Sequence, residues 1–154
     1  MLDKNVAIKE IFDNHGPDAI YVTTTGYISR DIYNLYPDHK NIFYMQGSMG
    51  LAPSIGLGLA LNSCKNVVVI SGDGSLLMHL GITHTIRDCC LSNLFVYILD
   101  NGSYESVGGQ SCPSLEESYN GINGIYKVKL GYKNGRVKLN CLENKKNIME
   151  FIKK

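Results

Sequence analysis

The sequence predicts an α/β fold in which helices cover both faces of a parallel sheet. Short apolar runs alternate with segments of helical spacing along most of the chain, which is typical of strands joined by crossover helices. Residues 67–70 are apolar at every position, as expected of a strand that is buried on both sides. Because 154 residues is the size of one ordinary domain, we expect a single domain over residues 1–154.

The elements follow one another in a regular order. The motif His15-Gly16-Pro17 ends the first helix, and the small residues after Gly50 favour a tightly packed helix. Beyond residue 110 the pattern weakens, so 126–130 and 135–139 are only candidates for short strands. The remaining expected elements are helices at 6–12, 29–35, up to 61, 75–88 and 148–152, and strands at 19–22, 42–45, 67–70 and 94–99.

Composition and charge exclude several classes of function. The 15 basic and 14 acidic residues nearly balance, and no basic run marks a surface for nucleic acid. The N-terminal residues do not resemble a signal peptide, and no apolar run approaches the roughly 18 residues of a membrane span, so we expect a cytoplasmic protein without membrane contact. The five cysteines and four histidines lack the spacing of disulfide frameworks or zinc sites.

Polar or glycine-rich loops follow four of the expected strands, at 23–27, 46–50, 71–75 and 100–104. The carboxyl ends of neighbouring parallel strands meet at one edge of a sheet, so we expect these loops to converge. Asp73 and Asn101 would supply oxygen ligands of the kind that Mg²⁺ shares with phosphates. A helix beginning at Ser75 would direct its positive end towards the same phosphates. The sequence therefore predicts a magnesium diphosphate site.

Each of these signals also has an ordinary structural interpretation. Gly-Asp-Gly is common in turns, and Asn101-Gly102 is a strong signal for a hairpin turn. Gly56 and Gly58 do not complete a dinucleotide fingerprint, because Leu61 stands at the position of its third glycine. We interpret these two glycines as close-packing positions on a buried helix.

Taken together, the motifs resemble those of thiamine diphosphate enzymes. Gly72-Asp73-Gly74-Ser75 is followed by Asn101, 28 positions after Asp73, which is similar to the magnesium and diphosphate motif of that family. The loop Gly47-Ser48-Met49-Gly50 and the stretches 24–26, 29–30 and 103–110 resemble the phosphonopyruvate and sulfopyruvate decarboxylases. The likeness covers about residues 20–112.

The resemblance implies thiamine diphosphate and Mg²⁺ as cofactors and the family's thiamine diphosphate-binding fold. Asp73 and Asn101 would bind Mg²⁺ through side-chain oxygens, and Ser103 through its carbonyl oxygen. Gly47 would accept a hydrogen bond from the aminopyrimidine and Met49 would hold the cofactor bent, so these two are the expected catalytic residues. The implied cofactor-binding residues are Thr25, Gly26, Gly47, Ser48, Met49, Gly72, Asp73, Gly74, Ser75, Asn101, Ser103 and Tyr104.

The resemblance also implies a partner. Enzymes of this family hold the cofactor between two domains, and the pyrimidine-binding domain contributes a glutamate for which this chain has no candidate in an apolar segment. We expect a hetero-oligomer in which this chain is the diphosphate-binding subunit, active only with a pyrimidine-binding (alpha) subunit. We also expect the family's last strand, after the final helix, to be missing.

The expected substrate is a small anionic 2-keto acid, in the first place 3-phosphonopyruvate, which would give phosphonoacetaldehyde and CO₂. A sulfopyruvate decarboxylase beta subunit is the close alternative, and a non-catalytic cofactor-binding or regulatory subunit is an alternative of another class.

Three residues near the expected site have weaker signals. We expect His79 to be an ordinary helix histidine near a subunit contact. Asp100 is expected to orient Asn101. Gln110, after two glycines, belongs either to a mobile cover over the substrate or to a surface loop.

Overall fold

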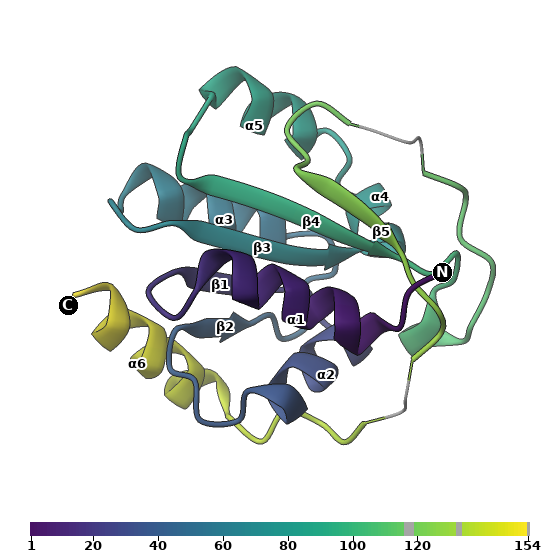
Figure 1. Cartoon of the computed structure of the whole chain (residues 1–154), viewed down its shortest axis with the longest axis horizontal. Coiled ribbons are helices and arrows are strands. Elements are labelled where there is room, and N and C mark those ends of the chain that lie inside the picture. The colour runs from purple at the N-terminus through teal and green to yellow at the C-terminus, as the bar shows by residue number, and fades with distance from the viewer. Residues whose placement is uncertain (116–118, 132–133, 154) are drawn as a thin grey trace.

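The computed structural model describes residues 1–115, 119–131 and 134–153. At its centre lies a five-stranded sheet of order β2-β1-β3-β4-β5, in which every pair of neighbouring strands is parallel (Figure 1). The strands are β1 (Ile20–Thr23), β2 (Ile42–Tyr44), β3 (Val67–Gly72), β4 (Leu94–Asp100) and β5 (Gly124–Lys127). The predicted fold class is confirmed.

Helices cover both faces of this sheet, as the sequence predicts. They are α1 (Lys4–His15), α2 (Tyr27–Leu35), α3 (Ala52–Leu61), α4 (Asp73–Met78), α5 (Ile82–Cys89) and α6 (Cys141–Ile152), with a 3₁₀ turn η1 at Glu105–Val107. In Figure 1, α1 and α2 lie in front of the sheet and α3 lies behind it. The apolar residues of α1 and α2 form one core cluster, and those of α3, α5 and α6 form another.

Strand β3 separates the two clusters and is buried along its whole length. Val67 and Val69 belong to the cluster under α3, whereas Val68 and Ile70 belong to the cluster under α1. This alternation explains the uninterrupted apolar run, because each face of a central parallel strand packs against helices.

The two glycines of α3 differ in their packing. A Cβ atom at Gly56 would lie 2.2 Å from Cγ2 of Val69, so Gly56 is a close-packing position, as expected. Gly58 is exposed, and a Cβ atom there would meet nothing within 4 Å. The close-packing interpretation is therefore wrong for Gly58, which lies on the outer side of the helix.

The helix expected over 75–88 is in fact two helices. α4 begins at Asp73, two residues early, and ends at Met78, and α5 begins only at Ile82. Gly81, a poor helix former, lies in the break. The break also brings His79 against the loop after β2, where a Cβ atom at Gly50 would lie 2.3 Å from Nδ1 of His79.

The C-terminal third differs from the expected strands. β5 occupies Gly124–Lys127 instead of 126–130, and Val128 makes only an isolated bridge with Leu2. Residues 135–139 form no strand. Val137 and Leu139 instead pack on the cluster under α1. Their apolar character reflects burial against the helix layer rather than sheet pairing.

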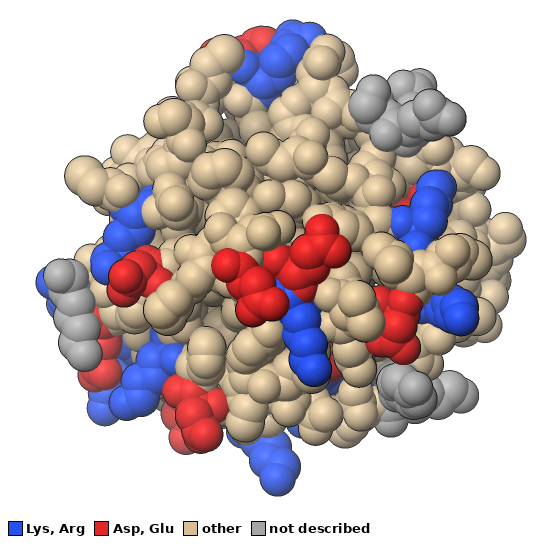
Figure 2. All heavy atoms as spheres, viewed as in Figure 1, with Lys and Arg blue, Asp and Glu red and all other residues tan. Residues whose placement is uncertain are grey.

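Charge is dispersed over the face shown in Figure 2, where acidic and basic side chains are interspersed among uncharged ones. Within the described part of the chain, the longest helices are too short and too polar to cross a membrane.

Candidate functional site

The site lies where the strand order reverses. The chain runs from β1 to β2 on one side and then to β3 on the other side of β1, so the loops after β1 and β3 diverge at the carboxyl edge of the sheet. Parallel sheets bind ligands in the crevice formed at such a point. A pocket is present there, and nine of the twelve expected cofactor-binding residues line it, namely Thr25, Met49, Gly72, Asp73, Gly74, Ser75, Asn101, Ser103 and Tyr104.

Asp73 is the buried carboxylate of this pocket. It is 3% exposed, and its Oδ2 accepts a hydrogen bond from the Gly102 N–H at 2.9 Å. Burial raises the pKa of the Asp73 carboxyl and the nearby Asp100 raises it further, while hydrogen bonds from the backbone of Gly74 and Gly102 and from the Cys112 thiol lower it. None of the ion pairs among the described residues includes Asp73. A buried carboxylate without a cation is unfavourable, so the pocket is suited to a bound cation.

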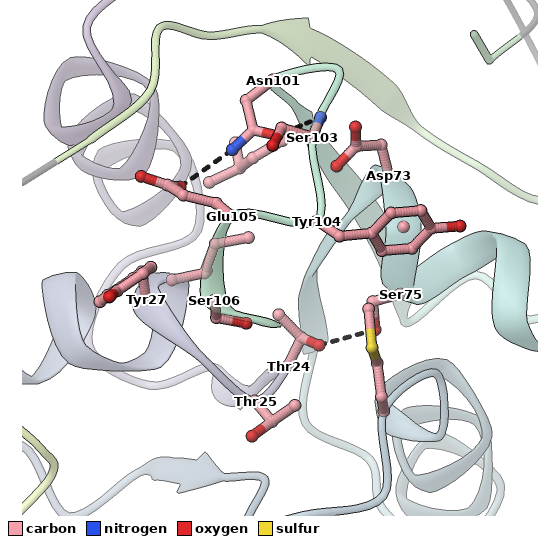
Figure 3. A pocket seen from close by; sticks show the side chains of 15 residues that line it. Thr24, Thr25, Tyr27, Asp73, Ser75, Asn101, Ser103, Tyr104, Glu105 and Ser106 are labelled. Atoms are coloured by element: carbon pink, nitrogen blue, oxygen red, sulfur yellow. Dashed lines mark hydrogen bonds between the residues drawn. The ribbon is translucent and has the colours of Figure 1, made fainter. Parts of the chain in front are cut away.

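Asn101 is held in one orientation by its own loop. Its Oδ1 accepts from the Ser103 N–H at 2.9 Å, and its Nδ2 donates to Oε2 of Glu105 at 2.9 Å (Figure 3). Glu105 also accepts from the Gly131 N–H at 3.0 Å. Because a carboxylate only accepts hydrogen bonds, Glu105 fixes which end of the amide carries the oxygen.

A buried ion pair supports Glu105 from the opposite side. Nζ of Lys4 lies 2.7 Å from Oδ2 of Asp31 and 3.4 Å from Oε2 of Glu105. Lys4 and Asp31 are both almost fully buried. This cluster joins α1, α2 and η1 behind the Asn101 loop, and sequence reasoning missed it because Lys4 and Glu105 are 101 positions apart.

Gly72 and Gly74, on either side of Asp73, leave room for neighbouring side chains to pack closely against the backbone. Neither glycine has a positive φ angle. A Cβ atom at Gly74 would lie 2.5 Å from Cε1 of Tyr104, and one at Gly72 would lie 3.2 Å from Cδ1 of Ile28. Any larger residue at Gly74 would therefore displace the Tyr104 ring from the pocket wall. The Gly-Asp-Gly motif is explained by packing around the carboxylate.

Ser75 connects three of the loops. Its Oγ lies 2.7 Å from Oγ1 of Thr24, after β1, and accepts from the Gly50 N–H, after β2, at 3.0 Å. All three residues are buried. The first contact is drawn in Figure 3. The predicted convergence of the loops is thus produced by specific hydrogen bonds.

Three of the expected residues lie outside this pocket. Gly47 and Ser48 are exposed, and both have positive φ angles, of 79° and 24°. Gly26 lines a neighbouring cavity, and a Cβ atom there would lie 2.7 Å from Oγ of Ser106. Met49 is half-buried and reaches the pocket wall, so the loop after β2 places only one of its three expected residues in the pocket.

Asp100 has a different role from the one expected. Its Oδ1 accepts from the Gly102 N–H at 3.1 Å, and its Oδ2 pairs with Lys127. It therefore orients the backbone of the turn rather than the Asn101 side chain. The chain bends at Gly102, where φ is 70°.

Gln110 lies beside the site but is exposed, and its backbone oxygen accepts from the Tyr104 N–H at 2.9 Å. This contact closes the loop that begins at Ser103, which also bridges Ser111. The structure thus favours the surface-loop interpretation.

Cys112 contacts Asp73, a role that no sequence motif indicates. It is 6% exposed, and burial together with the charge of Asp73 raises the pKa of its thiol to about 11. The thiol therefore stays protonated at neutral pH and donates to the Asp73 carboxylate.

The donor set fits Mg²⁺ shared with a phosphate. Across the described ranges, no group of three or more His, Cys, Asp or Glu side chains could hold a metal ion by itself. The pocket instead offers the carboxylate of Asp73, the amide of Asn101 and the backbone carbonyls of the loop after β4. Mg²⁺ is usually bound by one or two carboxylates with phosphate oxygens and water completing its octahedron.

Comparisons with known proteins agree with this geometry. The family model of the thiamine pyrophosphate enzyme, C-terminal TPP binding domain, matches residues 6–143. A sulfopyruvate decarboxylase subunit beta of Methanocaldococcus jannaschii is 48% identical over 103 residues, which are 67% of this chain and 54% of that protein. A phosphonopyruvate decarboxylase of Streptomyces hygroscopicus is 45% identical over 104 residues, 68% of this chain and 26% of that protein.

The chain thus spans about half the length of the first of these relatives and about a quarter of the second. An X-ray structure of a protein from Mycobacterium smegmatis, described as a "putative thiamin diphosphate-dependent enzyme", superposes with a TM-score of 0.61 and 25% identity. It covers 75% of this chain and 24% of that one. The family match extends over nearly the whole chain, and the pocket lies within it. The chain therefore belongs to the thiamine pyrophosphate enzyme family, as its C-terminal TPP binding domain.

Proposed function

We propose that this chain is the diphosphate-binding part of a thiamine diphosphate- and Mg²⁺-dependent 2-keto acid decarboxylase. The observation that carries the proposal is the buried Asp73 carboxylate, which has no cationic partner among the described residues. It lies in a pocket lined by other residues with oxygen atoms that could bind a metal ion. Such a pocket suits a divalent cation together with an anionic group whose oxygens complete the coordination of that cation.

The residues divide into a metal group and a cofactor group. Asp73 and Asn101 would bind Mg²⁺ through side-chain oxygens, with the carbonyl oxygen of Ser103 as a third ligand. The diphosphate would be bound by backbone N–H groups of Gly74 and Ser75 and by the loop of Thr25 and Gly26. Gly72 and Tyr104 would shape the wall around it.

The loop after β2 would act on the other end of the cofactor. The exposed carbonyl of Gly47 would accept a hydrogen bond from the aminopyrimidine, with Ser48 beside it and Met49 supporting the bent shape. When bound, the cofactor supplies the electron sink for the loss of CO₂. The protein's own contribution is to hold it in place.

A second polypeptide or domain would complete the site and supply the pyrimidine-side glutamate. Three relatives are named as beta subunits of sulfopyruvate decarboxylase, which supports an alpha partner for this chain. The surface next to the pocket also favours a partner, because Val107 is 62% and Met78 51% exposed there. A partner that covers these two side chains would remove their apolar surface from water.

Phosphonopyruvate is our first candidate substrate, and its decarboxylation would yield phosphonoacetaldehyde and CO₂. Sulfopyruvate is the second candidate, favoured by the relatives that are named beta subunits of sulfopyruvate decarboxylase, about half of whose length this chain matches. Both are three-carbon 2-keto acids with an anionic group on C3, so the site chemistry is shared.

The test is an assay of the chain with and without a pyrimidine-binding partner. With Mg²⁺ and thiamine diphosphate, the assembled protein should release CO₂ and an aldehyde from one of the two keto acids, and the chain alone should not. Full turnover by the chain alone would rule out the two-part site. If the assembly binds the cofactor tightly and decarboxylates neither acid, the non-catalytic alternative is correct.

A further inference from the structure

A second cavity adjoins the cofactor pocket and has a different charge. It has a volume of about 440 Å³ and shares Thr25 with the cofactor pocket. Its walls are formed by α2, by Met45 and Gln46 at the end of β2, and by residues 136–139. Two arginines line it, Arg30 from α2 and Arg136 from the segment before α6.

The positive charge of this cavity is not compensated. Among the described residues that line it none is acidic, and neither arginine takes part in an ion pair in those parts of the chain. Asp31 follows Arg30 in the helix, but its carboxylate is buried against Lys4 and the Asn134 amide. The guanidinium of Arg30 instead lies 4.7 Å from the centre of the Tyr27 ring, and its Nη1 donates to the uncharged Asn134 carbonyl at 3.4 Å.

Both arginines are held by the backbone around them. Ser29, just before Arg30, is buried and donates its hydroxyl to the Thr24 carbonyl, which fixes the start of α2 against the loop after β1. Nε2 of Gln46 donates to the Leu139 carbonyl at 3.0 Å, which fastens the segment of Arg136 to the loop after β2. The segments that carry the two arginines therefore line one cavity and are each fastened to a loop at the carboxyl edge of the sheet.

We infer that Arg30 and Arg136 bind the tetrahedral anionic group, phosphonate or sulfonate, on C3 of the 2-keto acid. A guanidinium presents a planar fork of donors that matches such oxygens, and two forks from opposite walls suit a group with three oxygens. Because Thr25 belongs to both cavities, an anion bound here lies next to the cofactor pocket. The inference rests on the proposed function for its substrate, although the anion site itself can be tested independently.

The cofactor's own diphosphate is the competing occupant. The cavity lacks the residues that would hold Mg²⁺, because Asp73, Asn101 and Ser103 line only the other pocket. A diphosphate bound through magnesium would thus be held on the far side of Thr25. Of the residues proposed to contact the diphosphate, Gly74 and Ser75 line only the cofactor pocket, whereas Thr25 and Gly26 line the arginine cavity, so we assign the arginines to a second anion beside the diphosphate.

The experiment compares Arg30→Gln and Arg136→Gln with the matched control Arg87→Gln in the assembled enzyme. Arg87 is the one other arginine of the sequence, lies outside both cavities and pairs with the exposed Asp88. The substrates are phosphonopyruvate, sulfopyruvate and pyruvate, which lacks the C3 anion. Each cavity variant should lose about 10- to 100-fold in kcat/KM for the anionic acids, as for a lost charged hydrogen bond, and change less than about 3-fold for pyruvate.

Two further readouts separate the alternatives. The affinity for thiamine diphosphate should be unchanged, and Arg30→Lys and Arg136→Lys, which keep the charge but not the fork, should recover part of the loss. Equal losses for pyruvate and the anionic acids would overturn the assignment in favour of a structural role. A weakened cofactor affinity with unchanged substrate preference would overturn it in favour of the diphosphate.

A direct titration keeps the site testable if no keto acid is decarboxylated. Methylphosphonate and methanesulfonate are added to the wild-type protein and to the three variants, and binding is followed by NMR chemical-shift changes. Binding that is lost in both cavity variants and kept in Arg87→Gln supports the anion site even if the proposed function fails. Absence of binding to the wild-type protein overturns it even if the proposed function holds.

Discussion

Replacing Asp73 by Asn should stabilise the metal-free protein while abolishing its response to the cofactor. Burial raises the pKa of the Asp73 carboxyl above its ordinary value, so the fold disfavours the charged form. Asn has nearly the same shape and keeps an oxygen that accepts from the Gly102 N–H. The substitution therefore removes an unpaired buried charge without opening a cavity.

The expected gain at pH 7 is about 1 kcal/mol, the usual scale of one side-chain change, and it raises Tm by about 2–4 °C in a chain of this size. A carboxyl whose pKa is raised in the folded state destabilises the fold above that pKa. The gain should accordingly shrink as the pH falls and the wild-type carboxyl takes up its proton, and it should vanish below the ordinary pKa of aspartate.

Mg²⁺ and thiamine diphosphate should reverse the order of stability. At about 100 times the dissociation constant, a ligand that binds only the folded protein adds about 2.7 kcal/mol, which outweighs the gain from Asn. Wild type should then melt several degrees above the variant, whose Tm should not respond to the cofactor.

The assay is thermal unfolding of the assembled protein in excess chelator and again with metal and cofactor. Asp100→Asn is the matched control, because Asp100 is 4% exposed but paired with Lys127, so it should lose stability without ligands. If Asp73→Asn melts below wild type in chelator, or if its Tm rises with the cofactor as much as that of wild type, the reasoning about an unpaired metal-binding carboxylate is wrong.

Three further predictions concern the walls of the site. Met49→Ala should keep the affinity for Mg²⁺ and thiamine diphosphate but lower kcat, which titration and steady-state kinetics would show; an unchanged kcat would make Met49 an ordinary packing residue. Glu105→Gln should weaken Mg²⁺-dependent cofactor binding by about 10-fold, because the new amide no longer fixes the amide of Asn101, and unaltered affinity in a metal titration would refute this. Gly74→Ala should cost about 1–3 kcal/mol of stability in denaturant unfolding, because its Cβ atom would lie 2.5 Å from the Tyr104 ring; combining it with Tyr104→Ala should restore most of the loss, and a fully additive double variant would contradict the clash.

The sequence predicts those parts of the molecule that depend on local pattern. The apolar run of β3 and the loops at strand ends follow from alternation along the chain, and so the convergence on Asp73 could be expected before any coordinates. The break between α4 and α5 could not, because the spacing of apolar residues continues through it. The same limit applies to Gly58, whose exposed position depends on the rotation of α3 relative to β3.

Contacts between distant segments account for the rest. Lys4 and Glu105 meet across 101 positions, and Arg30 and Arg136 share a cavity although no periodicity connects them. Apart from the resemblance at residues 29–30, the signals at these single positions are those of ordinary surface charges. These four residues come together only because α1, α2 and the segment after β5 pack on the same face of the sheet. Lys4 and Glu105 then form a buried support, and Arg30 and Arg136 line an anion cavity.

The central claim is that the pocket at the carboxyl edge of β1, β3 and β4 binds thiamine diphosphate through a divalent cation held by Asp73 and Asn101. Isothermal titration of thiamine diphosphate into the assembled protein, once with Mg²⁺ and once in excess chelator, tests this claim most directly. The account predicts saturable binding with Mg²⁺ and none in chelator, because the diphosphate would otherwise face the Asp73 carboxylate without a bridging cation. Equal affinity under the two conditions would contradict it.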